Sequence, residues 1–380
     1  MPDIAVTAVE DKAGLDAFIQ LPKRLFAGQT GYVPPLDLER REALSARHNP
    51  LFQHLEARFF LARRAGRVVG RISAQVDRAY LQRYADATGH FGCLVALDDP
   101  AIFAALFDAA ESWLRGKGMK RVTGPFSLSI NEEVGLLVAG FDAPSSMMVP
   151  WDPPYAGARV EAAGYGKLKD LYSYDYDIQT APETSGKRLL ARGGLAGRVK
   201  VRSANVKFFD AELRTLIGIF NDAWSDNWGF VPFTQAEIDH AAVALRPVIV
   251  PELVIFVEVD DEAVGFILAL TNINEALAGL GGKLNLWTLP KLLWRLRIAG
   301  VESLRVPLMG VAKKLHGTRL ASQLAFMLIE FTRRDCVGKF GIKVGEFGWI
   351  LEDNKGMLSI AQLPGAKVNH RYRIYEKALS

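Results

Sequence analysis

Cysteine is nearly absent from this sequence. Only Cys93 and Cys336 occur among its 380 residues, and no cysteine or histidine pair has the spacing of a metal site. This usage argues against a bound metal and indicates a reduced, cytoplasmic protein.

Long apolar runs and dense basic tracts are also missing. No run of about 18 apolar residues occurs, which argues against a membrane-spanning helix. The opening residues, MPDIAVTAVEDKAGLDAF, are acidic where a secretion signal needs positive charge followed by an apolar run. The 46 Lys and Arg residues are nearly balanced by 42 Asp and Glu residues, so nucleic acid is not an expected partner. The small net positive charge is compatible with binding of a phosphate-bearing molecule or of an acidic lipid surface.

The length favours two domains, and an internal repeat supports this number. Residues 59–77 predict a hairpin that turns at Ala65-Gly66, with Gly70 in its second strand. Residues 253–270 predict a similar hairpin that turns at Asp260-Asp261, with Gly265 in its second strand.

The ends of the two halves match as well. Residues 162–178 and 363–379 each run from a helix end through a glycine into an aromatic strand. Gly164 pairs with Gly365, and Tyr174 with Tyr375, at the same offset. We therefore predict units at 1–180 and 199–380, joined by a linker at 181–198 that is rich in Gly, Ser, Thr and Arg.

Between these landmarks each half repeats one order of elements. An opening strand is followed by one or two helices, the hairpin, an amphipathic helix, a strand, a short helix and a closing strand. The sequence thus predicts an α/β fold (α+β mixed sheet) of two tandem units, each a mixed, mostly antiparallel sheet flanked by helices.

This order resembles the GNAT (acyl-CoA N-acyltransferase) fold, and the second half carries two of its motif regions. The first is the pyrophosphate loop, R/Q-x-x-G-x-G/A, which corresponds here to the stretch from Val311 to Arg319. Glycine and exposed N–H groups at a helix start suit a phosphate. The sequence departs from the motif with Lys314 at its first position and Arg319 at its last.

The second motif region follows a later strand, in EFGWILEDNKGMLSIAQLPGA. Asn354 and Gly365 have the family's spacing of eleven residues. The family's usual general acid, a tyrosine seven residues after the asparagine, is replaced by Ala361. The usual acid is thus missing from its usual place.

Nearly the whole chain also resembles a bacterial group of two-unit GNAT-like proteins, on residues 124–155, 220–234 and 348–357. At the level of the fold it is similar to bacterial ceramide synthase-type acyltransferases. The resemblance implies an N-acyltransferase that uses acyl-CoA or acetyl-CoA as co-substrate and no metal. The expected CoA-binding residues are Val311, Lys313, Lys314, His316, Gly317, Thr318, Arg319 and Asn354. The first half lacks the phosphate loop, and its Asp98 and Asp99 would repel a pyrophosphate.

Four residues are candidates for the proton transfers. Glu346, in a strand of the second half, and Glu133, which follows a strand of the first, could accept a proton from an ammonium group. Tyr372 and Tyr375 could replace the missing tyrosine as general acid. Simple packing or a solvated strand end remains the alternative for each.

The acceptor is expected to be a small-molecule or lipid amine. Candidate contacts are Asn131, Asn227, Trp224 and Trp228, the last three in an aromatic stretch that suits an amphiphile. Residues 284–299 read as a basic, Trp- and Leu-bearing helix that could lie on the inner face of a membrane, with a packing helix as the alternative. Two other functions stay open: a binding or scaffold protein that has lost catalysis, and acetylation of a small soluble amine.

Overall fold

The computed structural model describes residues 3–179, 197–246, 249–361 and 366–379, which fold into two compact units. Unit 1 comprises Met1–Tyr172, Leu277–Leu292 and Asn369–Ser380. Unit 2 comprises Ser173–Ala276 and Leu293–Val368. Most of the predicted linker lies outside the described residues.

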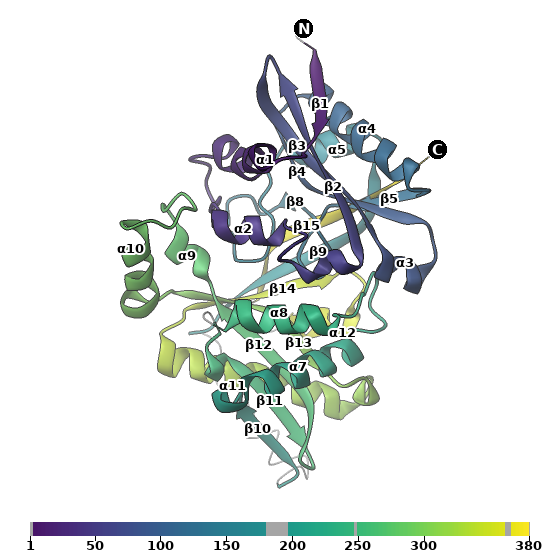
Figure 1. Ribbon diagram of the computed structural model, residues 1–380. Helices are drawn as coiled ribbons and strands as arrows, with labels where there is room; N and C mark the ends of the chain where they lie inside the picture. Colours follow the sequence, from purple (N-terminus) through teal and green to yellow (C-terminus); the bar gives the residue numbers. More distant parts are fainter. Residues whose placement is uncertain (1–2, 180–196, 247–248, 362–365, 380) are drawn as a thin grey trace. The chain divides into compact units, whose positions relative to one another are not determined.

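Unit 1 is built on a mixed sheet with the order β1-β2-β3-β4-β5-β15 (Figure 1). All these pairs are antiparallel except β4 with β5. The strands up to residue 179, together with the last strand, are β1 (Ile4–Ala8), β2 (Leu55–Arg64), β3 (Arg67–Asp77), β4 (Thr88–Ala96), β5 (Arg121–Gly124), β6 (Phe126–Ser127), β7 (Glu133–Val134), β8 (Leu136–Ala139), β9 (Gly166–Asp177) and β15 (Lys367–Ala378). Strands β6 and β7 pair as a separate two-stranded sheet, and the residues of β9 from Ser173 onward belong to unit 2. The helices are α1 (Lys12–Leu25), α2 (Asp37–Ala43), α3 (Arg78–Tyr84), α4 (Pro100–Gly116) and α5 (Ala156–Ala162), with a 3-10 turn at Pro50–Gln53.

Helices cover both faces of this sheet, because side chains alternate along each strand. Phe60 and Ala62 of β2 pack with α4, whereas Leu61 between them packs in a cluster with Phe18 and Ile19 of α1. Each face of the sheet thus has its own apolar core.

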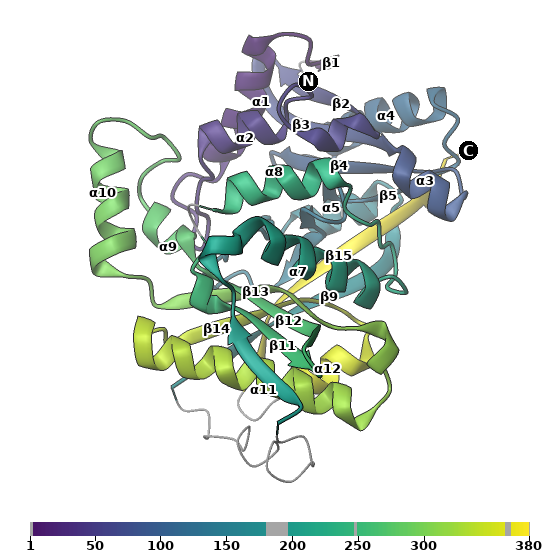
Figure 2. The same ribbon diagram turned by 60° about the horizontal axis from the view of Figure 1, so that its bottom comes forward.

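Unit 2 repeats the plan, with the order β14-β13-β12-β11-β10 and parallel pairing only between β13 and β14. Helix α7 packs on β12 and β13, and α11 covers the opposite face (Figure 2). The elements from residue 199 onward are β10 (Val199–Ser203), α7 (Phe209–Ala223), α8 (Gln235–Leu245), β11 (Val254–Val259), β12 (Glu262–Thr271), α9 (Ile273–Leu277), α10 (Thr288–Trp294), β13 (Ser303–Val311), α11 (Arg319–Asp335), β14 (Val344–Leu351) and α12 (Lys355–Ala361). Shorter helical turns lie at Val206–Phe208, Pro251–Leu253, Arg295–Ala299, Lys313–Leu315 and Cys336–Phe340.

The two predicted hairpins are equivalent in detail. Ala65-Gly66 and Asp260-Asp261 all have positive φ, which matches the twist of a two-residue hairpin turn. Gly70 in β3 lies opposite Ala62, beside a shift in register, and Gly265 in β12 lies opposite Val257, beside the same kind of shift. The repeat therefore extends to the irregularities of the strands.

The closing strands depart from the predicted boundaries. In unit 1, β15 from the end of the chain pairs with β5 and with β8. In unit 2, Ile178 at the end of β9 donates its N–H to the Lys343 carbonyl, and β9 neighbours β14. Residues 277–292 also belong to unit 1. An aromatic strand pattern specifies pairing without specifying the partner, so the sequence does not fix the unit to which each closing strand belongs.

We expect Tyr375→Ala to destabilise unit 1. Its side chain is fully buried in that unit's core, and its hydroxyl donates to Glu161 Oε1 over 3.3 Å. Loss of this ring should cost about 3–5 kcal/mol in the free energy of unfolding. Lys367→Ala, at the exposed start of the same strand, should stay within about 0.5 kcal/mol of the wild type.

Hydrogen exchange identifies the strands that lose stability. In Tyr375→Ala, peptides that cover β5 and β8 should lose protection first. Loss of protection confined to β13 and β14 would contradict the assignment of β15 to unit 1.

Candidate functional site

The predicted phosphate loop lies where β13 ends and α11 begins. Gly317 has a φ of +74° and no atom within 4 Å of the position that a Cβ would take. Thr318 is the N-cap of α11, and its Oγ1 accepts from the Ala321 N–H over 3.2 Å. The other first-turn N–H groups of a helix have no partner inside the helix, so this end suits an anion.

Hydrogen bonds hold the loop in shape. His316 Nε2 donates to the Val311 carbonyl over 2.7 Å, which links the middle of the loop to its start. The Lys313 N–H donates to Asp222 Oδ2 over 2.6 Å, so the end of α7 supports the loop from its side. His316, predicted to contact CoA, therefore also braces the loop.

The cationic side chains of the loop differ in whether they form ion pairs. Lys313 Nζ lies 2.7 Å from Asp226, and Lys314 Nζ lies 2.6 Å from Glu262. Both pairs are solvent-exposed and therefore weak, so a phosphate can compete for these lysines. Arg319 makes no ion pair within the described part of the chain, and it sits on the first turn of α11.

The equivalent helix start in unit 1 is already occupied. Asp99 is the N-cap of α4, and its Oδ1 accepts from the Ala101 N–H over 2.8 Å. Arg64 donates to Asp99 Oδ2 over 2.6 Å, and this hydrogen bond lowers the pKa of the Asp99 carboxyl. Pro100 follows at the first helical position and offers no N–H. A carboxylate of the chain thus takes the place that a phosphate would need.

Glu346, the first candidate base, is buried beside Arg305. The two residues are register partners on the parallel strands β14 and β13, with Arg305 Nε 3.5 Å from Glu346 Oε1. Arg305 also donates to the Gly348 carbonyl over 2.9 Å. Both side chains are almost fully buried, so this carboxylate has a structural task in unit 2.

The predicted aromatic cluster of unit 2 forms around Phe220 of α7. Its ring centroid lies 5.0 Å from that of Trp224, 5.7 Å from Phe230 and 5.6 Å from Phe233. Trp224 also lies 6.2 Å from Trp349 of β14, and its Nε1 donates to the Met309 carbonyl.

The remaining aromatic-stretch candidates lie beside this cluster. Trp224, Trp228 and Asn227 are all half-buried, and the Asn227 N–H donates to the Trp224 carbonyl over 2.9 Å. A half-exposed aromatic face with an amide beside it suits an amphiphilic ligand.

Asn354 begins α12. Its Oδ1 accepts from the Met357 N–H over 3.1 Å, which is a helix-capping contact. Ala361 is buried at the end of the same helix, and Gly365 lies outside the described residues.

The two candidate tyrosines lie in unit 1. Tyr372 and Tyr375 of β15 are both buried, and burial raises the pKa of Tyr375 well above its usual range, with the Glu161 carboxylate adding to the shift. Tyr372 stacks against His370 at 5.8 Å. Their environment is that of core residues.

Glu133, the second candidate base, belongs to a group of charged side chains in unit 1. Arg40 Nη1 lies 3.3 Å from Glu133 Oε1. Burial disfavours the charged form of Arg40, but the Glu133 and Glu39 carboxylates more than offset this and raise its pKa. Burial raises the pKa of the neighbouring Glu132 to about 7, although a hydrogen bond from the Leu128 N–H opposes the shift.

Two further residues complete this acidic group. Burial also raises the pKa of Asp152 to about 7, and its Oδ2 accepts from the Leu137 N–H over 2.9 Å. Asn131, a predicted substrate contact, is half-buried in the same loop as Glu132. Sequence reasoning missed Arg40, Asp152 and Arg305, because their partners are distant in sequence.

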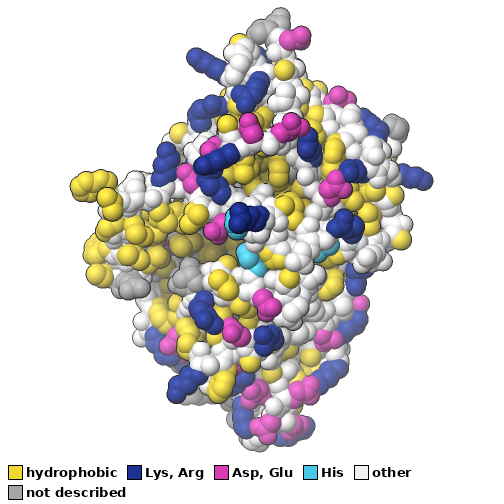
Figure 3. Space-filling view, in the orientation of Figure 1, with side chains coloured by type: hydrophobic (Ala, Val, Ile, Leu, Met, Phe, Trp, Pro, Cys, Tyr) yellow, Lys and Arg dark blue, Asp and Glu magenta, His cyan; other side chains and the backbone are white. Residues whose placement is uncertain are grey.

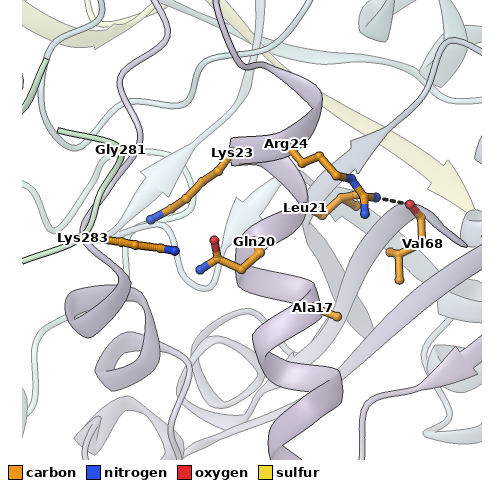
Figure 4. Close-up of a pocket in the computed structure, with 8 residues that line it drawn as sticks. All are labelled: Ala17, Gln20, Leu21, Lys23, Arg24, Val68, Gly281 and Lys283. Atoms are coloured by element: carbon orange, nitrogen blue, oxygen red, sulfur yellow. Dashed lines mark hydrogen bonds between the residues drawn. The ribbon is translucent and has the colours of Figure 1, made fainter. Parts of the chain in front are cut away.

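A small open pocket also lies in unit 1 (Figure 4). It has a volume of about 360 Å3 and is lined by Ala17, Gln20, Leu21, Lys23, Arg24, Val68, Gly281 and Lys283. None of the predicted site residues lines it. Elsewhere in the described residues, no three His, Cys, Asp or Glu side chains gather as a metal site would require. Among the described helices, none combines the length and the apolar character needed to cross a membrane.

A unit used twice, with parallel pairing at its central strands and a helix start after the fourth strand, defines a tandem GNAT protein. The solved structure of a tandem GNAT protein from the clavulanic acid biosynthesis pathway matches 100% of this chain and 99% of its own, with a TM-score of 0.58 and 13% identity. No family model matches the chain.

Two relatives match over nearly the full length. The bacterial ceramide synthase of Caulobacter vibrioides is 47% identical over 379 residues, which are 99% of this chain and 98% of that protein. Protein YghO of Escherichia coli is 41% identical over 372 residues, 97% of this chain and 94% of that protein. The chain therefore belongs to the family of the bacterial ceramide synthase, and the predicted fold and N-acyltransferase class are confirmed.

We expect Gly317→Val to weaken CoA binding by about tenfold or more, because a β-branched residue is strained at positive φ and fills the space beside the helix start. Gly218→Ala is the matched control, since Gly218 lies in α7 with open space around it. Titration calorimetry with CoA measures both. Equal affinities for Gly317→Val and wild type would refute the loop assignment.

Glu346 can be tested by separating its charge from its packing. Glu346→Gln leaves Arg305 buried without its carboxylate and should cost about 3–5 kcal/mol. The double variant Arg305→Met/Glu346→Leu removes both charges and should regain most of this stability. Urea unfolding measures the difference, and a single variant as stable as the wild type would contradict the ion pair.

Proposed function

We propose that this protein transfers a long-chain acyl group from acyl-CoA to the amine of a sphingoid base. The observation that carries this proposal is the 47% identity, over the full length of both chains, to a bacterial ceramide synthase. The half-exposed aromatic face around Trp224 and Trp228 supports an amphiphilic substrate.

The donor is proposed to bind in unit 2 at the Val311–Arg319 loop. Its pyrophosphate would accept hydrogen bonds from first-turn N–H groups of α11, with Arg319 as the nearest uncommitted cation. The two lysines would exchange their exposed carboxylate partners for phosphate oxygens.

The acceptor needs a group that takes a proton, because an aliphatic amine is largely protonated at neutral pH. We propose Glu132 for this task because burial raises its pKa to about 7, with Glu133, the residue predicted from the sequence, as the alternative. The amine nitrogen then forms a bond to the thioester carbonyl carbon, and the carbon–sulfur bond breaks. The thiolate leaves as CoA and takes up a proton, so the products are an amide and free CoA.

Direct assay decides between this function and two others. Purified protein with sphinganine in detergent micelles and palmitoyl-CoA should give an N-acyl product by mass spectrometry and release one CoA thiol for each amide. Turnover of acetyl-CoA with a small soluble amine alone would replace the proposal with small-amine acetylation. CoA binding without turnover of any amine would indicate a binding protein.

The pH profile tests the base. A carboxyl whose pKa is raised by burial acts as a base only above that pKa, so the rate should rise through about pH 7. The same carboxyl affects the free energy of unfolding in the opposite direction. Its stabilising contribution is fully present below the pKa of an ordinary carboxyl and is lost as the pH rises through about 7.

Glu132→Gln should abolish the rise of the rate through about pH 7 and slow turnover by about 100-fold or more. Glu39→Gln, which removes an exposed carboxylate beside Arg40, should keep this rise and most of the rate. If Glu133→Gln alone abolishes the rise, Glu133 is the base. Wild-type profiles in both Glu132→Gln and Glu133→Gln would exclude the acidic group from proton transfer.

A further inference from the structure

The segment around α10 leaves large apolar side chains in solvent. Leu286 is 89% exposed, Trp287 87%, Ile298 73% and Trp294 55%. Leu292 is the one buried residue among those of α10 itself. Figure 3 shows the resulting concentration of apolar side chains over α10 on this face. Exposed tryptophan is costly in water unless another phase covers it.

The charge of this segment has one sign. No Asp or Glu occurs between Glu275 and Glu302. Lys283 and Lys291 are exposed and make no ion pair within the described residues. Apolar side chains flanked by uncompensated cations match a surface that has an apolar interior and anionic headgroups.

The start of the segment, at Gly282, is hydrogen-bonded within unit 1. The Gly282 carbonyl accepts from the Asp37 N–H over 2.8 Å. Lys23 Nζ donates to the Pro35 carbonyl and pairs with Asp37, and it lies against Gly282. The start of the segment is therefore held in place by a hydrogen bond and a close contact with Lys23.

The small pocket lies beside the start of the segment, where Gly281 and Lys283 line it (Figure 4). Lys283 points into it toward Gln20, and Lys23 and Arg24 line it. Asp37 neutralises Lys23, and the Val68 carbonyl holds Arg24, which leaves Lys283 as the cation available to a ligand. Its position directly before Leu284 places a phosphate-binding group beside the apolar segment.

We propose that residues 283–292 are a membrane-contact element for an anionic phospholipid bilayer. Leu286 and Trp287 enter the boundary between headgroups and acyl chains. Lys283 and Lys291 bind lipid phosphates at that depth, with the pocket at Lys283 receiving a headgroup. This goes beyond the proposed function, since bilayer binding requires neither acyl-CoA nor an amine.

Vesicle flotation without substrates tests the proposal. Wild-type protein should float with phosphatidylcholine vesicles that contain about 30% phosphatidylglycerol, and less with phosphatidylcholine alone. Raising the salt to about 0.5 M should weaken binding to the anionic vesicles. Leu286→Ser/Trp287→Ser should lower the partition coefficient by about tenfold or more.

Matched variants separate the apolar and the charged contributions. Val206→Ser/Phe208→Ser removes two other exposed apolar side chains, 65% and 64% exposed, and should bind as the wild type does. Lys283→Glu/Lys291→Glu should lose the preference for anionic vesicles. An equal loss in both apolar variants, or no flotation of the wild type, would overturn the proposal.

A second copy of the chain is the competing occupant. If light scattering finds a stable dimer that Leu286→Ser/Trp287→Ser dissociates, and vesicles do not bind, the segment is a protein interface and the proposal is wrong. Activity on micellar amine distinguishes this outcome from failure of the proposed function. The segment variants should keep that activity and lose turnover only when the amine is presented in vesicles.

Discussion

The pairing of β15 with β5 and β8 is the constraint on which the architecture depends. It supplies the strand beside β5 and buries Tyr372, Ile374 and Tyr375 in unit 1. Closing a chain loop of this length costs little more than closing a shorter one, since the entropy grows only with the logarithm of loop length. Burial of two tyrosines and an isoleucine readily exceeds that increment.

Local features of the fold could be predicted from the sequence, and choices between equivalent partners could not. The hairpins with Gly70 and Gly265 are encoded within about twenty residues by turn residues and strand alternation. The choice of β15 as the neighbour of β5 depends on register and packing across the sheet. An aromatic strand carries no local signal for that choice.

The candidate site shows the same difference between features that are local in sequence and partners that are distant in sequence. The loop at Gly317 could be recognised as a candidate because a glycine directly before a helix start is a local signal in the sequence. Arg305, which pairs with Glu346, and Arg40, which pairs with Glu133, are invisible to a linear pattern. Each is joined to its carboxylate by folding alone, so sequence reasoning found the acids without their counter-ions.

The Asp99 cap on α4 has a consequence for how the two units respond to ligand. An internal carboxylate is present at a fixed effective concentration, so the start of α4 is stabilised whatever the surrounding solution contains. The start of α11 is capped by the uncharged Thr318 hydroxyl, and an anion bound there would add stability as RT ln(1 + [L]/Kd). With the donor bound at the proposed site, the stability of unit 2 would follow the supply of an anionic ligand, whereas the start of α4 would not respond to it.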